Sequence, residues 1–83
     1  MYMKEKGMCS SAFTVCTDMY SYLLFRVGGK MFAVDGNKKD IEFLKHTQKR
    51  ILDKNIKVKY QNVEDGICCD VKEIEFIDEQ VNV

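Results

Sequence analysis

The sequence has no proline, no tryptophan, a single histidine and no long apolar run. Its longest apolar stretch, around Tyr20 to Val27, is far shorter than the roughly 20 residues of a membrane-spanning helix. The N-terminal residues also lack the apolar core of a secretory signal. We therefore expect a cytoplasmic protein with no membrane partner. Eleven lysines against two arginines are typical of an AT-rich genome, such as that of a low-GC bacterium or one of its mobile elements.

Catalytic and cofactor motifs are missing as well. No Walker-type phosphate loop occurs, and the pattern brings no two carboxylates into a common cleft. The four cysteines, at positions 9, 16, 68 and 69, fit none of the usual zinc spacings. His46 is expected on the solvent side of a helix with nothing to orient it. The sequence therefore predicts no enzyme, no metal and no cofactor, and we expect reduced thiols with Cys16 and Cys69 buried as small apolar residues.

A length of 83 residues allows one domain, 1–83, with a single core. Hydrophobic residues make up 46% of the chain and charged residues 31%, which is ordinary for a folded globular protein. Residues 1–10 are expected to be poorly ordered or extended.

Two turn signals indicate β-hairpins. The dipeptide Gly28-Gly29 separates two apolar and aromatic runs, and glycine allows the positive φ angles of a two-residue hairpin turn. This turn would set Phe25 opposite Phe32 and Leu23 opposite Val34.

Asp65-Gly66 is the second turn signal, and it joins two further predicted strands. Continuous pairing from this turn would set Val58 opposite Glu73. The apolar positions resume one residue later, at Ile74, so we predict a bulge near Lys72 and Glu73 that restores the inward face.

One helix is predicted between the hairpins, from an N-cap at Asn37 to a left-handed C-cap at Asn55. At about 100° per residue, an apolar stripe should pack on the sheet; it consists of Ile41, Leu44, Gln48, Ile51 and Leu52. Residues 12–16 could form an extra strand before the first hairpin. An alternative prediction is a helix over residues 18–28, but the aromatic and β-branched side chains of this segment favour strands.

The predicted fold is thus α+β: a small antiparallel sheet of two hairpins with one helix packed on one face. The order is ββαββ, with an additional N-terminal strand left open.

Positive charge gathers around Phe43 on the opposite face of this helix. Its companions there are Lys39, His46, Thr47, Arg50 and Lys54. The aromatic ring of Phe43 could stack on a nucleic-acid base while the neighbouring basic side chains hold phosphates, or it could anchor a protein interface. It could equally widen the apolar stripe or be covered by the N-terminal segment.

Charge is also partitioned along the chain. Residues 1–61 carry twelve basic and six acidic side chains, and residues 62–83 carry one basic and seven acidic. The acidic end, including Glu64, Asp65, Asp70, Glu73 and Glu75, could imitate a phosphate backbone. It could also serve only as a set of cross-strand partners for Lys57 and Lys59.

These patterns predict a small non-enzymatic protein-binding module. We expect an inhibitor or regulator that occupies a site on a larger protein, such as a nucleic-acid-processing enzyme, in the manner of the small anti-defence proteins of phages and mobile elements. Its contacts would come from Phe43 and the acidic residues. The alternative is a nucleic-acid binder that uses Lys39, Phe43, Arg50, Lys54, Lys57 and Lys59, although such binders usually carry a basic excess. A homodimer through an uncovered strand edge is also open.

Overall fold

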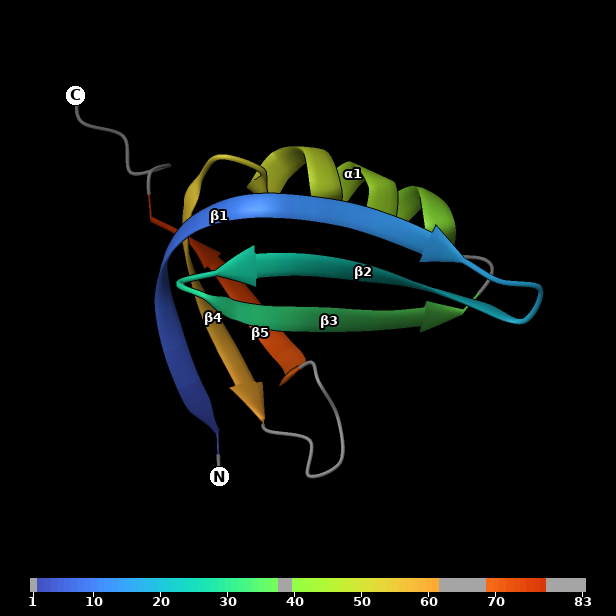
Figure 1. The fold of residues 1–83 in the computed structure, drawn as a ribbon. Helices are drawn as coiled ribbons and strands as arrows, with labels where there is room; N and C mark the ends of the chain where they lie inside the picture. Colours follow the sequence, from blue (N-terminus) through green and yellow to red (C-terminus); the bar gives the residue numbers. More distant parts are fainter. Residues whose placement is uncertain (1, 38–39, 62–68, 78–83) are drawn as a thin grey trace.

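The computed structural model describes residues 2–37, 40–61 and 69–77, except for the side chains of Asn37 and Cys69. Five strands and one helix follow one another along this part of the chain (Figure 1): β1 (Met3–Cys16), β2 (Tyr20–Val27), β3 (Lys30–Asn37), α1 (Ile41–Ile51), β4 (Asn55–Gln61) and β5 (Cys69–Phe76). The α+β class is confirmed. The order ββαββ is matched only roughly, because β1 is a full strand of 14 residues in front of the first hairpin.

The sheet closes into a barrel with the strand order β1-β2-β3-β5-β4. The first half of β1, Met3 to Met8, pairs with β4, and the second half, Cys9 to Cys16, pairs with β2. A register shift between Cys9 and Ser11 marks the change of partner, and Figure 1 shows β1 curving around the molecule. The prediction of a purely antiparallel sheet is therefore wrong. β3 and β5 run parallel through two residue pairs, and a long bent β1 completes the closure.

The first hairpin has the predicted register. Phe25 lies opposite Phe32 and Leu23 opposite Val34, and the two phenylalanine rings stack with centroids 5.5 Å apart. The turn dipeptide Gly28-Gly29 takes φ angles of 58° and 84°, a region that glycine enters without steric cost.

The predicted bulge between β4 and β5 is also confirmed. Tyr60 pairs with Val71 and Lys59 with Glu73, so Lys72 is the extra residue. Val58 consequently faces Ile74, and the apolar side chains of both strands point into the barrel. The predicted turn Asp65-Gly66 lies outside the described residues.

Both predicted helix caps are wrong. β3 pairs with β2 as far as Asn37, which holds that residue in the sheet, and Asp40 precedes the helix instead. At the other end the left-handed residue is Asp53, with φ of 64°, while Asn55 already begins β4. The competing strand pairings therefore outweighed the local cap preferences of asparagine.

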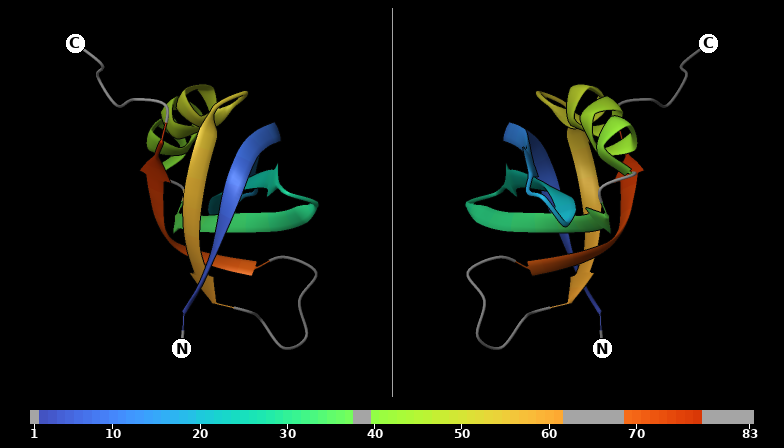
Figure 2. Two further views of the ribbon diagram at one scale, coloured as in Figure 1. Left: turned by 90° about the vertical axis from the view of Figure 1, so that its left-hand side faces the viewer. Right: turned by 90° about the vertical axis from the view of Figure 1, so that its right-hand side faces the viewer.

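Two residues of the predicted helix stripe, Leu44 and Ile51, are buried in the core. They meet the inward side chains of the strands, which are Cys9, Leu23, Phe25, Val27, Phe32, Ile56, Val58 and Tyr60. α1 packs against β1, β2 and β3, and the hydroxyl of Thr14 in β1 donates a hydrogen bond to Oε1 of Gln48 at 2.7 Å. Figure 2 shows α1 at one end of the barrel, beside the C-terminal end of β5. Among the described residues, no helix has the length and apolar character needed to cross a membrane.

Candidate binding surfaces

Three neighbouring strands are apolar on their outer side as well as their inner side. In β2 the inward residues Ser21, Leu23, Phe25 and Val27 are buried, so the alternate residues face outward. An antiparallel sheet with one face on the core normally presents polar side chains on the other. Here the outward positions form what we call the outer apolar face: Phe13 and Val15 of β1, Tyr20, Tyr22 and Leu24 of β2, and Met31 and Ala33 of β3.

Strand register makes this face continuous. Leu24 lies between Phe13 on β1 and Ala33 on β3. The ring of Tyr22 stacks on that of Tyr20, with centroids 5.9 Å apart. Phe13 is 45% exposed and Tyr20 50% exposed. The face is therefore open to a ligand rather than covered by the described part of the chain.

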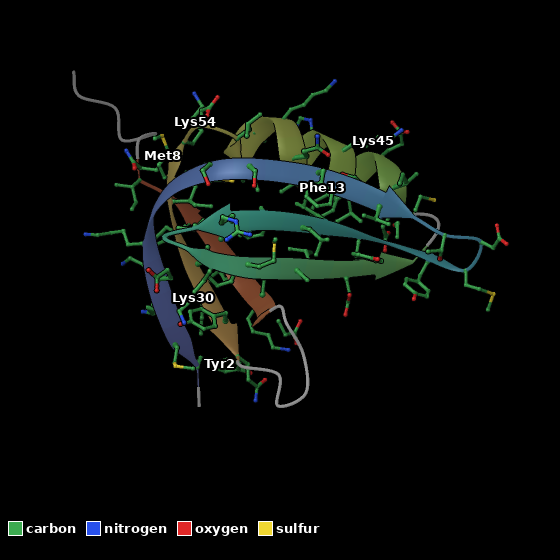
Figure 3. The ribbon with its side chains drawn as sticks, viewed as in Figure 1. Tyr2, Met8, Phe13, Lys30, Lys45 and Lys54 are labelled. Carbon is green, nitrogen blue, oxygen red and sulfur yellow. The ribbon has the colours of Figure 1, made fainter. Side chains whose placement is uncertain are left out.

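Two opposite charges border the outer apolar face. Arg26 pairs with Met31, Asp35 pairs with Tyr22, and both charged residues are exposed. Phe13 also borders a hollow of about 490 Å³ between β1 and α1, and Figure 3 shows it on β1 near the helix. The face thus combines aromatic side chains, an aliphatic centre and little net charge.

The outer apolar face was not predicted from the sequence, although β2 contains a signal for it. Residues 20–25 read Tyr-Ser-Tyr-Leu-Leu-Phe without the polar alternation of β4, whose sequence is Asn-Ile-Lys-Val-Lys-Tyr-Gln. Apolar residues at successive positions, without polar alternation, are typical of a strand that is covered on both faces.

A second surface is a groove between α1 and β5, with a volume of about 380 Å³. Its lining comes from α1 (Phe43, His46, Thr47 and Arg50), from β3 (Val34) and from β5 (Val71, Lys72, Glu73, Ile74 and Phe76). Phe43 is 64% exposed, and the guanidinium of Arg50 lies 4.4 Å from the ring centroid of Phe76. The predicted site residues Phe43, Arg50 and Glu73 are therefore brought together in this α1–β5 groove.

The third surface is an array of four lysines on β1 and β4. Lys4 lies directly opposite Lys59, and Lys6 directly opposite Lys57. Like charges that face each other across an antiparallel pair are destabilising. The ring of Tyr2 lies beside this lysine array, with its centroid 4.9 Å from the ammonium of Lys59.

Each described carboxylate of the predicted acidic site lies beside a lysine. Glu75 is 3.7 Å from Lys57, and Glu73 lies opposite Lys59. Asp70 is 2.8 Å from the ammonium of Lys72 and, by accepting its hydrogen bond, raises the pKa of that lysine. Glu64 and Asp65 lie outside the described residues. The described carboxylates thus form mixed-charge pairs rather than a continuous negative surface.

The predicted nucleic-acid site is dispersed in the structure. Phe43 and Arg50 line the α1–β5 groove, whereas Lys57 and Lys59 belong to the lysine array on other strands. Lys54 lies in the connection between α1 and β4. Lys39 is outside the described residues.

The two described thiols differ sharply in environment. Cys9 is fully buried, and this burial raises its pKa. Cys16 is exposed, so its predicted burial is wrong: it is the last residue of β1, paired with Ser21 at the end of the ladder. In the described residues no three His, Cys, Asp or Glu side chains are grouped so that they could hold a metal ion.

The sequence matches no known protein-family model. Comparisons with curated proteins and with solved structures also find no significant match. Any function must therefore be argued from these three surfaces.

Proposed function

We propose that this protein is a non-enzymatic binding module whose outer apolar face docks on a larger protein. One observation carries the proposal: β1, β2 and β3 present apolar side chains on both of their faces. A contiguous exposed apolar patch usually marks an interaction surface. A module of this kind would inhibit or regulate its partner by occupying a site, in the way of small phage proteins that act against host defence systems.

The composition of the face supports a protein partner. Aromatic residues, methionine and arginine are enriched at the centres of protein interfaces, whereas lysine and glutamate are depleted. The outer apolar face has Phe13, Tyr20, Tyr22 and Met31 together with bordering Arg26. The partner surface should therefore be apolar at its centre and carry a carboxylate where it meets Arg26.

The architecture points to the same face by analogy. A five-stranded Greek-key barrel with one helix resembles the OB-fold, in which ligands bind on strands 2 and 3 and the adjoining loops. A fold alone does not specify a ligand. The near absence of positive charge on this face favours a protein over a nucleic acid there.

The test is affinity capture from the native host with wild type and two matched variants. Phe13→Asp places a charge on the outer apolar face, and Phe43→Asp makes the same change on an exposed ring elsewhere. Loss of a captured protein with Phe13→Asp, but not with Phe43→Asp, is the expected result. Equal capture by all three proteins, or an eluate that contains only nucleic acid, would contradict the proposal.

A second candidate function, nucleic-acid binding, is favoured by the lysine array. Four lysines lie in two opposed pairs, and a phosphate between them would relieve the like-charge repulsion that Glu75 and Glu73 offset only on the β5 side. Tyr2 offers an exposed ring for base stacking. If four phosphates of a single strand were held, the slope of log K against log salt would be about −2.8, which corresponds to a loss of affinity of about 50-fold between 50 and 200 mM salt.

This second candidate is tested by fluorescence anisotropy with labelled oligothymidine. A Lys4→Glu/Lys59→Glu variant should lose binding, while Lys45→Glu/Lys49→Glu, which changes two exposed helix lysines, should not. Binding that is absent in wild type, or equally weakened by both double variants, would reject the lysine array as a nucleic-acid site.

A further inference from the structure

We propose that the α1–β5 groove binds an extended peptide, which adds as a strand to the edge of β5 that no described strand pairs with beyond Asp70. This site is separate from the outer apolar face, so the inference stands or falls independently of the proposed function. Three features carry it: an incomplete strand ladder, the direction of two main-chain groups, and the apolar hollow beside them.

The ladder between β3 and β5 is short. It consists of the pairs Phe32 with Cys69 and Ala33 with Asp70, whereas β5 continues to Phe76. Beyond Asp70, no strand in the described part of the chain pairs with β5 on the side away from β4. An unpaired strand edge is a template for another extended chain.

The main-chain groups of Ile74 and Phe76 point toward this open side. Directly opposed residues in an antiparallel ladder alternate between hydrogen-bonded and non-hydrogen-bonded pairs. The backbone N–H of Ile77 donates to the carbonyl of Asn55 at 3.1 Å, so the next pair, Ile56 with Phe76, is non-hydrogen-bonded. The same alternation applies to Val58 with Ile74. Both residues of β5 therefore direct N–H and C=O away from β4.

The adjoining groove supplies contacts for side chains. Val34 and Val71 provide apolar walls, and the exposed ring of Phe43 stands at the rim. Peptides that bind by strand addition obtain affinity from main-chain hydrogen bonds and specificity from pockets for alternate side chains. A suitable peptide would place one apolar side chain in the hollow while its main chain pairs with Ile74 and Phe76.

A second copy of this chain fits the edge less well than a lone peptide. α1 lies next to the C-terminal end of β5 in both views of Figure 2, and a groove of about 380 Å³ holds a short segment rather than another barrel. Edge-to-edge pairing of two copies would also bring each helix against the other barrel. We therefore assign the groove to a peptide segment of a different protein.

The test begins with a phage-displayed library of random dodecapeptides, selected on wild-type protein and then measured on purified variants. Selected peptides should bind Phe43→Asp about tenfold or more weakly and bind Phe13→Asp as they bind wild type. Because both rings are exposed, thermal unfolding should show both variants folded. This pair of variants also separates failure here from failure of the outer apolar face.

Amide hydrogen exchange by NMR supplies the readout specific to strand addition. The amides of Ile74 and Phe76 should exchange quickly in the free protein and become protected when the selected peptide binds. The proposal is overturned if no peptide is enriched, if protection appears on β2 and β3 instead, or if Phe43→Asp leaves affinity unchanged. It is also overturned if the free protein already protects these amides as a dimer.

Discussion

Deleting Lys72 should be well tolerated, although a one-residue deletion within a strand normally inverts every side chain beyond it. Lys72 is the extra residue of the β4–β5 bulge. Without it, Glu73 still faces Lys59 and Ile74 still faces Val58, now in a regular ladder. The direct loss is the Lys72–Asp70 ion pair, whose side chains are 38% and 36% exposed; a pair at the surface contributes little to stability because solvent screens it.

Deleting Lys57 is the matched control, because it removes another surface lysine but from a regular part of the ladder. The slip must turn a fully buried residue such as Ile56 to solvent, and truncating a buried aliphatic side chain costs about 2–5 kcal/mol. A domain of this length has only roughly 4–12 kcal/mol of stability at about 0.05–0.15 kcal/mol per residue. The Lys57 deletion should therefore be close to unfolding.

Urea unfolding followed by far-UV circular dichroism measures both deletions, since the chain has no tryptophan for fluorescence. The free energy of unfolding should fall by about 2–5 kcal/mol without Lys57, and by much less without Lys72. Equal losses for the two deletions would refute the reasoning. They would mean that the bulge is needed to curve the barrel wall and not merely to keep the register.

Three further predictions concern single side chains. Phe43→Ala should lower the free energy of unfolding by less than about 1 kcal/mol because the ring is 64% exposed. Phe32→Ala, at a fully buried position, should lower it by about 3–5 kcal/mol. Similar losses for the two variants in urea titrations would contradict the exposure of Phe43. Gly28→Ala should cost about 1–3 kcal/mol because φ is +58°, whereas the nearby Glu5 carboxylate ends a flexible side chain that can move aside; an unchanged thermal unfolding midpoint would contradict the strained turn. In a Cys68→Ser/Cys69→Ser background, a thiol reagent at pH 8 should label exposed Cys16 at once and Cys9 only on unfolding. Burial raises the pKa of Cys9. The contribution of the buried Cys9 thiol to stability should therefore be complete below the unfolded-state pKa of about 8.5 and should decline as the pH rises above that value. Rapid labelling of both thiols, or a free energy of unfolding that increases at alkaline pH, would argue against the burial of Cys9.

Local patterns predicted the parts of the fold that depend on neighbouring residues. The dipeptide Gly28-Gly29 determined both the turn and the register of β2 with β3, because only a two-residue loop aligns those apolar runs. The bulge at Lys72 followed from the broken apolar period of β5. Alternation shows which side chains point inward, however, and not which strand lies alongside. The two-residue parallel ladder between β3 and β5 and the double pairing of β1 therefore had no local signal.

The candidate sites show the same division. Helical periodicity correctly brought Phe43 and Arg50 to one face of α1, but their nearest companions on β5 depend on barrel closure. The lysine array combines residues about fifty positions apart, and its members on β1 could not be found from the predicted basic residues of the helix and β4 alone. The outer apolar face was recognisable in principle because Tyr20, Tyr22 and Leu24 replace the polar residues expected on a solvent-facing side of β2.

The double pairing of β1 also has a consequence for the order of folding. Its second half can join β2 and β3 through short loops, which form quickly because little chain entropy is lost. Its first half must wait for β4, whose residues lie about fifty positions away along the chain, and contacts of such long range slow folding. During synthesis on the ribosome, a three-stranded meander should therefore emerge first, with its amino-terminal extension unpaired until the helix and β4 have left the exit tunnel.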